Sequence, residues 1–161
     1  MANDVSTALV SENNQLLCVR VGEQEFALDI RAIREIRGWI SSTPLPHAPA
    51  YVKGMINLRG SVLAIIDLAE RLGLPGTTAN ATSVVVVIES GNRVIGLLVD
   101  AVSDIITVKD GMRQVTPESG SSASRKYVEG LLMRDEQIIS VLSIEAIMPN
   151  EAAIEVDLEA V

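Results

Sequence analysis

Side chains that could carry catalysis are scarce in this chain of 161 residues. A hydrolytic triad needs a general base beside its nucleophile, and His47 is the one imidazole that could serve. His47 lies within the proline-rich stretch 44–49, which predicts a connecting loop and not a positioned catalytic site. The single cysteine, Cys18, falls inside an expected strand, where a small buried apolar role is usual. The sequence therefore predicts a protein that is not an enzyme.

Metal ions and phosphate-bearing cofactors have no recognisable site either. One histidine and one cysteine cannot form a zinc cage or a disulfide within the chain. The glycines have the spacing of turn and strand glycines, and no glycine-rich phosphate loop precedes a helix. The pair Asp100 and Asp104 could perform acid–base chemistry, but carboxylates at a strand end usually face solvent. We expect no cofactor and no metal.

The composition excludes further classes of protein. A net charge of −8 argues against nucleic acid as a partner, because phosphate backbones are bound through clustered Lys and Arg. No apolar run approaches the ~20 residues that span a bilayer, and residues 1–14 lack the pattern of a signal peptide. We expect a cytoplasmic protein that does not insert directly into a membrane.

The elements that must position any binding residues come from an internal repeat. At an offset of 69 residues, Leu17 aligns with Val86, and the match continues to Ile36 and Ile105. At an offset of 76, the block that starts at Tyr51 aligns with the block that starts at Tyr127. Order, turn glycines and apolar spacing agree, so we interpret the chain as two copies of one unit.

Each copy predicts five short strands, which favours a mainly β fold of two small barrels with short helices. In the first copy Leu17, Val19 and Val21 alternate with less apolar positions, which predicts a half-buried strand, whereas 84–88 is apolar on both faces. The segment Asp67–Glu70 has the pattern of a helix capping box. The expected strands cover 15–21, 24–29, 34–39, 54–58 and 61–66, then 84–89, 93–99, 104–108, 130–134 and 137–142.

One turn presents a charged residue that turn chemistry does not explain. Asn57 and Gly60 suit a hairpin bend, from which Arg59 would project. The second copy has Asp135 in place of Arg59. Two copies with turns of opposite charge predict two different binding surfaces, although neutral drift of exposed residues would give the same pattern.

These residues resemble the CheW coupling proteins of bacterial chemotaxis over about 15–148. The block Lys53–Gly60 is the most specific part of the resemblance, and Ala64 departs from it, because the family usually has proline there. The fold also occurs in the CheA histidine kinase and in CheV, but no kinase core or receiver accompanies it here. The matching stretches are Phe26–Ile30, Ile33–Gly38, Tyr51–Gly60, Ile65–Leu68 and Gly96–Asp104.

The resemblance implies two tandem five-stranded SH3-like β-barrel subdomains, compatible with exchange of a terminal strand. We expect a flexible segment over 1–14, a first barrel over about 15–72, a second over about 84–148 and an acidic tail over 149–161. The implied function is that of a scaffold without catalysis. It would join the CheA histidine kinase to the cytoplasmic tips of methyl-accepting chemotaxis proteins, and would be recruited to their membrane-associated arrays.

The resemblance also implies two binding faces. A receptor helix would lie in a groove between the barrels and place apolar anchors there, with charged residues that fix its register. The kinase would bind an apolar face of the first barrel, although core packing would account for the same residues. The receptor set is Ile33, Glu35, Arg37, Gly54, Arg59, Val99, Asp100 and Val102, and the kinase set is Met55, Ile56, Val62 and Ile65.

Three other interpretations remain compatible with the sequence. The chain could couple a different chemosensory pathway, such as one that governs surface motility. It could bind a small ligand in a barrel mouth, which would need convergent polar groups in an apolar pocket. It could also be an acidic structural subunit that self-assembles through strand edges.

Overall fold

The structure is a computed structural model that describes residues 15–76, 79–80, 82–109, 111–114 and 126–149. The expected flexible segment 1–14 lies outside the described residues. So does the expected acidic tail, apart from Pro149.

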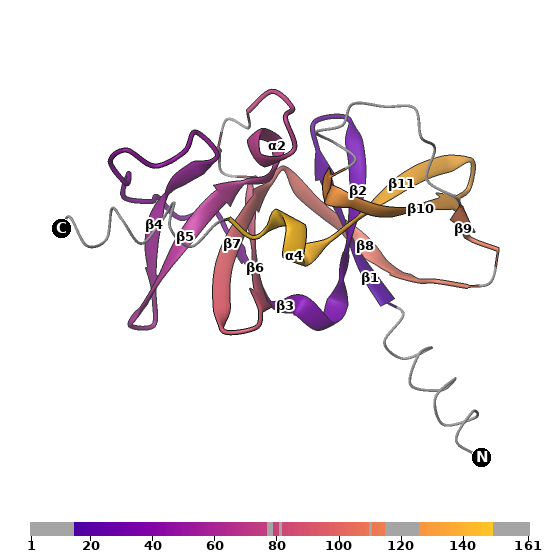
Figure 1. The fold of residues 1–161 in the computed structure, drawn as a ribbon, viewed down its shortest axis with the longest axis horizontal. Coiled ribbons are helices and arrows are strands. Elements are labelled where there is room, and N and C mark those ends of the chain that lie inside the picture. The colour runs from indigo at the N-terminus through magenta and orange to yellow at the C-terminus, as the bar shows by residue number, and fades with distance from the viewer. Residues whose placement is uncertain (1–14, 77–78, 81, 110, 115–125, 150–161) are drawn as a thin grey trace, which may run out of the picture.

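The predicted mainly β fold with short helices is confirmed, and every expected strand is present (Figure 1). A two-residue strand, β9, is additional, and β8 begins three residues earlier than 104 because its start pairs with β1. The elements in order are β1 (Gln15–Val21), β2 (Gln24–Asp29), η1 (Ile30–Ala32), β3 (Ile33–Gly38), β4 (Val52–Leu58), β5 (Ser61–Asp67), α2 (Leu68–Arg71), β6 (Val84–Ser90), β7 (Arg93–Val99), β8 (Ala101–Thr107), β9 (Arg113–Gln114), β10 (Val128–Arg134), β11 (Gln137–Leu142) and α4 (Ile144–Ile147).

The strands form two sheets that lie side by side (Figure 1). Sheet A has the order β8-β1-β2-β11-β10-β9, and sheet B has the order β3-β6-β7-β5-β4. Each sheet contains one parallel pair, β2 with β11 in sheet A and β7 with β5 in sheet B, and all other neighbours are antiparallel. Apart from β9, the two sheets have the same order when repeat-equivalent strands are matched.

The sheets do not follow the two copies of the repeat. Sheet A contains β1 and β2 from copy one together with β8, β10 and β11 from copy two. Sheet B contains β6 and β7 from copy two together with β3, β4 and β5 from copy one. The expected bounds 15–72 and 84–148 therefore describe the repeats, and neither copy forms a sheet by itself. The exchange is larger than that of a terminal strand, because two strands of each copy cross over.

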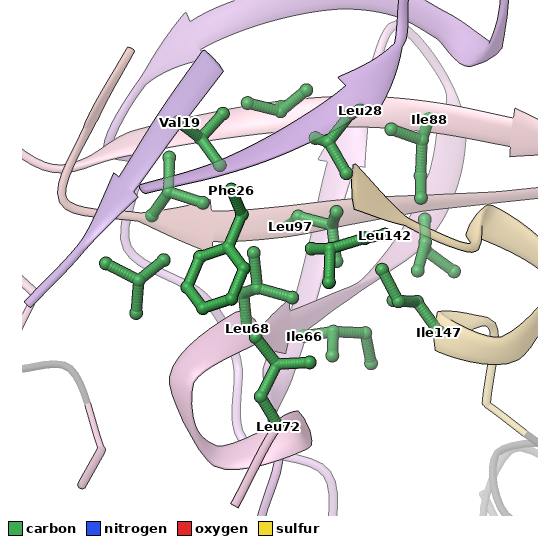
Figure 2. Close-up of a cluster of buried hydrophobic side chains, with 14 of the residues drawn as sticks. Val19, Phe26, Leu28, Ile66, Leu68, Leu72, Ile88, Leu97, Leu142 and Ile147 are labelled. Atoms are coloured by element: carbon green, nitrogen blue, oxygen red, sulfur yellow. The ribbon is translucent and has the colours of Figure 1, made fainter. Parts of the chain in front are cut away.

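Three apolar cores hold this arrangement together. One lies between the sheets and includes Phe26, Ile66, Leu97 and Leu142, which come from both sheets and both copies (Figure 2). A smaller core lies within sheet A, and another lies within sheet B. Their buried members are Leu16, Cys18, Ala27, Ile106, Val108, Leu132, Ile139 and Val141 in sheet A, and Ile56, Leu58, Leu63, Ile65, Val85, Val87 and Leu98 in sheet B.

The prediction that β1 is half-buried is wrong. Leu17 and Val19 face the core between the sheets, whereas Leu16 and Cys18 face the core of sheet A. Cys18 is buried, as expected from the sequence. Because one face of β1 packs on the core between the sheets and the other on the core of sheet A, β1 is covered on both faces, and buried residues are spread over both copies.

The exchange predicts that a chain cut in the connector between α2 and β6 will give two fragments that cannot fold alone as monomers. Each fragment would keep strands whose partners lie in the other fragment. We expect weak circular dichroism and poorly dispersed NMR spectra for each fragment, and recovery of the native spectrum when equimolar fragments are mixed. A folded monomer of either fragment would contradict the prediction.

Candidate functional site

A tight hairpin turn between β4 and β5 positions Arg59. Arg59 (φ 52°) and Gly60 (φ 88°) both have positive φ, as a two-residue hairpin turn of type I′ requires. The Asn57 side chain accepts a hydrogen bond from the amide of Gly60 at 2.9 Å, which fixes the turn. The expected bend is therefore present, and it directs Arg59 toward β3.

Arg59 forms an ion pair with Glu35 on β3. Arg59 Nη2 donates to Glu35 Oε2 at 2.8 Å, and Arg37 Nη1 donates to Glu35 Oε1 at 3.4 Å. The hydrogen bond from Arg59 lowers the pKa of Glu35 below its ordinary value of 4.5, and Arg37 acts in the same direction. Because the Arg59 side chain is 68% exposed, its contribution to stability is small and its guanidinium remains accessible to a partner.

A hollow of about 220 Å³ lies beside this ion pair. Its apolar lining includes Leu58, Leu63 and Val87, and its charged lining consists of Arg34, Glu35 and Arg59. Arg34 also pairs with Glu89 across the β3–β6 ladder at 3.3 Å. The surface here therefore combines an apolar base with charges that are already paired inside the molecule.

Gly54 lies where β4 meets the segment that follows β3. A bridge between Thr43 and Met55 joins the two segments. A side chain at Gly54 would place its Cβ 2.4 Å from the carbonyl oxygen of Thr43, and the φ of Gly54 is +152°. Glycine is needed here for close backbone contact, whether or not a partner also approaches.

Two further receptor-set residues, Val99 and Asp100, lie at the end of β7 and directly after it. Val99 is fully buried in the core between the sheets. The Asp100 carboxylate accepts from the amide of Gly22 at 2.6 Å and so holds the β1–β2 turn. Within the described residues, no hydrogen bond or ion pair joins Asp100 to Glu35 or Arg59. The expectation that Val99 contacts a partner directly is therefore wrong.

Ile33 and Val102 are repeat-equivalent residues that follow the two crossovers between the sheets. Each is partly buried and packs against the core between the sheets. Their exposed portions remain available, so both stay candidates for apolar contact.

The four residues expected at the kinase face divide by accessibility. Ile56 and Ile65 are buried in the core of sheet B, at 5% and 0% exposure, because strand alternation turns them inward. They cannot present a surface to a partner, so their assignment to a binding face is wrong. Val62 is 58% exposed, and Met55 is partly buried against the core between the sheets.

The second copy carries counterparts of these features that the sequence comparison missed. Arg134 donates to Asp104 at 2.8 Å, as Arg59 does to Glu35. Asp104 aligns with Glu35. The residue that aligns with Arg59 is Asp135, and Arg134 lies one position before it. A comparison that allowed this one-residue shift would have found the pair.

Exposed apolar residues repeat in the same way. Ile36 on β3 and Ile105 on β8 are equivalent and are 46% and 55% exposed. Val62 on β5 and Ile138 on β11 are equivalent and are 58% and 62% exposed. Both sheets therefore present apolar surface at matching positions.

The described part of the chain offers neither a reactive thiol nor a cluster of metal ligands. Burial raises the pKa of the Cys18 thiol to about 11, so the nucleophilic thiolate is scarce near neutral pH. Among the described residues, no cluster of three or more His, Cys, Asp or Glu is placed to hold a metal ion. The described helices are all too short to cross a membrane.

The family model for the CheW-like domain matches residues 15–152. The chain belongs to this family. Chemotaxis protein CheW of Rhizobium meliloti (strain 1021) is 46% identical over 143 residues, which cover 89% of this chain and 92% of that protein. A probable chemotaxis protein CheW of Rhizobium etli is 47% identical over 135 residues, which cover 84% and 87% of the two chains.

A solved structure shows the same fold. The crystal structure of the scaffolding protein TtCheW from Thermoanaerobacter tengcongensis matches with a TM-score of 0.77 and 25% sequence identity. The match covers 86% of this chain and 94% of that one. Family membership and fold therefore agree, and two five-stranded SH3-like units with β9 added to one of them describe the molecule.

The Glu35–Arg59 pair predicts a measurable pKa. The folded-state pKa of Glu35 lies below that of the unfolded chain, so the pair adds stability above the unfolded-state pKa, and this is lost as the pH falls through the folded-state pKa. In an NMR titration of the side-chain carboxyl, we expect a pKa below 4.5 that rises toward 4.5 in Arg59→Asn. Arg34→Asn should leave it unchanged, and an ordinary pKa in the unmodified protein would refute the pairing.

Proposed function

We propose that this protein is a non-catalytic adaptor that couples chemoreceptors to a CheA-type histidine kinase in bacterial chemotaxis. It would act in the cytoplasm and be recruited to receptor arrays at the membrane. Membership of the CheW-like family over residues 15–152 is the observation that carries the proposal. Relatives named as chemotaxis CheW proteins and a structural neighbour named as a scaffolding protein support it.

The charged cluster on β3 and the β4–β5 turn is the proposed receptor contact. Arg59 is largely exposed, yet its pairing with Glu35 orients the guanidinium at the edge of a hollow whose lining is part apolar and part charged. A receptor helix could place an apolar side chain in the hollow and a polar one against Arg59, with Arg37 nearby. Such charge contacts fix the register of the helix more than they add affinity.

Val62 is the centre of the proposed kinase contact. It is exposed on β5, whereas its neighbours Leu63 and Ile65 are buried in sheet B. A partly exposed valine on a rigid strand suits a partner that presents a flat apolar surface. A modest interface of this kind gains strength in an array, where tethering raises the effective concentration of each partner.

Replacing Arg59 tests the receptor contact. Arg59→Asp should preserve the turn, because Asp135 adopts φ 50° in the equivalent turn of the second copy. We expect binding to receptor fragments on vesicles, measured by co-sedimentation, to fall by roughly tenfold, which is about 1.4 kcal/mol.

Two further variants separate the possible causes. In Glu35→Arg with Arg59→Asp, the internal pair re-forms with reversed charges, so binding should stay weak if a partner needs the cation at position 59. Asp135→Asn changes a charge in the matching turn and should leave binding intact. Full recovery in the double variant would show that the internal pair alone matters and would remove Arg59 from the receptor contact.

Replacing Val62 tests the kinase contact. A carboxylate in a desolvated apolar contact is costly, so Val62→Asp should weaken binding to the kinase by roughly tenfold with no loss of folding. Val62→Thr keeps the shape of the side chain and should lose less. Isothermal titration with the isolated kinase measures both, and unchanged affinity in Val62→Asp would place the kinase contact elsewhere.

A further inference from the structure

The two short helices end in different ways, although they occupy equivalent positions in the repeat. Helix α2 closes its own end: Gly73, with φ +82°, donates its amide to Glu70 O at 3.0 Å. Leu74 donates to Ala69 O at 2.8 Å. This is the glycine-dependent closure that satisfies the last carbonyls of a helix.

Helix α4 cannot use the same closure. The offset of 76 residues that aligns the copies places Pro149 at the position of Gly73. Proline has no amide hydrogen, so it cannot donate to the preceding turn. A helix of four residues is also too short to be stable by itself, and its final carbonyls need partners from elsewhere.

Arg71, the last residue of α2, provides those partners. Its Nε donates to Ile147 O at 2.9 Å, and its Nη2 donates to Ala146 O at 3.3 Å and to Met148 O at 3.1 Å. A planar guanidinium with fixed donors suits a group of neighbouring carbonyls. Arg71 and Ile147 occupy equivalent positions in the two copies, so the copies bond directly to each other at this point.

The same guanidinium also lies against two equivalent tyrosines. Arg71 Cζ is 4.5 Å from the ring centre of Tyr51 and 5.2 Å from that of Tyr127. Contacts of this kind add attraction between the cation and the ring face. Tyr51 immediately precedes β4, the strand that carries Gly54 and Met55 and leads to the Arg59 turn. Arg71 therefore connects α4 to the start of the strand that bears the candidate partner contacts.

We propose that Arg71 is a positioning residue for the adaptor function: it holds α4 of the second copy against α2 and Tyr51 of the first copy, next to the start of β4, without contacting a partner. The functional part rests on the adaptor function proposed above. Ile147 and Met148 are buried in the core between the sheets, but apolar packing has little directional preference. The hydrogen bonds of Arg71 are directional, so they fix the position of α4 relative to α2.

Amide hydrogen exchange tests the structural part. The amides of Ile147 and Met148 donate to Ser143 O and Ile144 O, both at 3.1 Å, and report on opening of α4. We expect their exchange to accelerate at least tenfold in Arg71→Met and less in Arg71→Lys. Arg34→Met removes an exposed arginine on β3 and should change neither rate. Unchanged exchange in Arg71→Met would overturn the proposal.

A second-site change sharpens this test. Pro149→Gly restores an amide hydrogen and the conformational freedom that α2 has at Gly73. In the background of Arg71→Met, we expect Pro149→Gly to return the exchange rates of α4 toward those of the unmodified protein. The new amide would match the bond from Gly73 to Glu70 O and so reach only Ala146 O, and failure of this rescue would exclude Ala146 O as the carbonyl through which Arg71 acts.

Kinase activation in a mixture with receptor fragments tests the functional part. We expect Arg71→Met to lower activation severalfold and the added Pro149→Gly to restore it. Ile139→Val weakens the separate core of sheet A and serves as a stability control that should keep activation. Normal activation in Arg71→Met would overturn the positioning role. Failure of the unmodified protein to activate the kinase would instead overturn the adaptor function. The exchange data would still test whether Arg71 holds α4 in place.

Discussion

The structure depends on one constraint: every strand pair of one copy must complete its sheet with strands from the other copy. Strands β1 and β2 leave copy one to join β8, β10 and β11, while β6 and β7 leave copy two to join β3, β4 and β5. Backbone amides and carbonyls inside a sheet must be paired, so neither copy can satisfy all of its hydrogen bonds alone. The two sheets are therefore one folding unit, although each has its own small core.

The exchange also explains why the interior is divided into three cores. A strand such as β1 contributes alternate residues to the core of its own sheet and to the core between the sheets. The core between the sheets has the larger set of residues and draws them from both copies. Any surface formed by both sheets is thus supported by the same packing that holds the molecule together.

Near-symmetry makes the differences between the copies informative. Both copies place an acid on the third strand beside an arginine near the following hairpin, as in Glu35 with Arg59 and Asp104 with Arg134. The helix ends differ, because one copy has Gly73 and the other has Pro149. Arg71 compensates for that difference across the two copies. Function and regulation can therefore diverge at the turns and helix ends while the sheets stay equivalent.

The sequence by itself determined the strands, their tight turns and the internal repeat, because alternation, turn glycines and the Asn57–Gly60 pattern are local properties. It also placed Arg59 at the tip of an exposed turn. Which strands pair is a long-range property, so only the tertiary structure showed the exchange, the burial of Ile56, Ile65 and Val99, and the shift to Arg134. Local alternation does not say what covers each face of a strand, and proximity between distant residues depends on how the two copies pack.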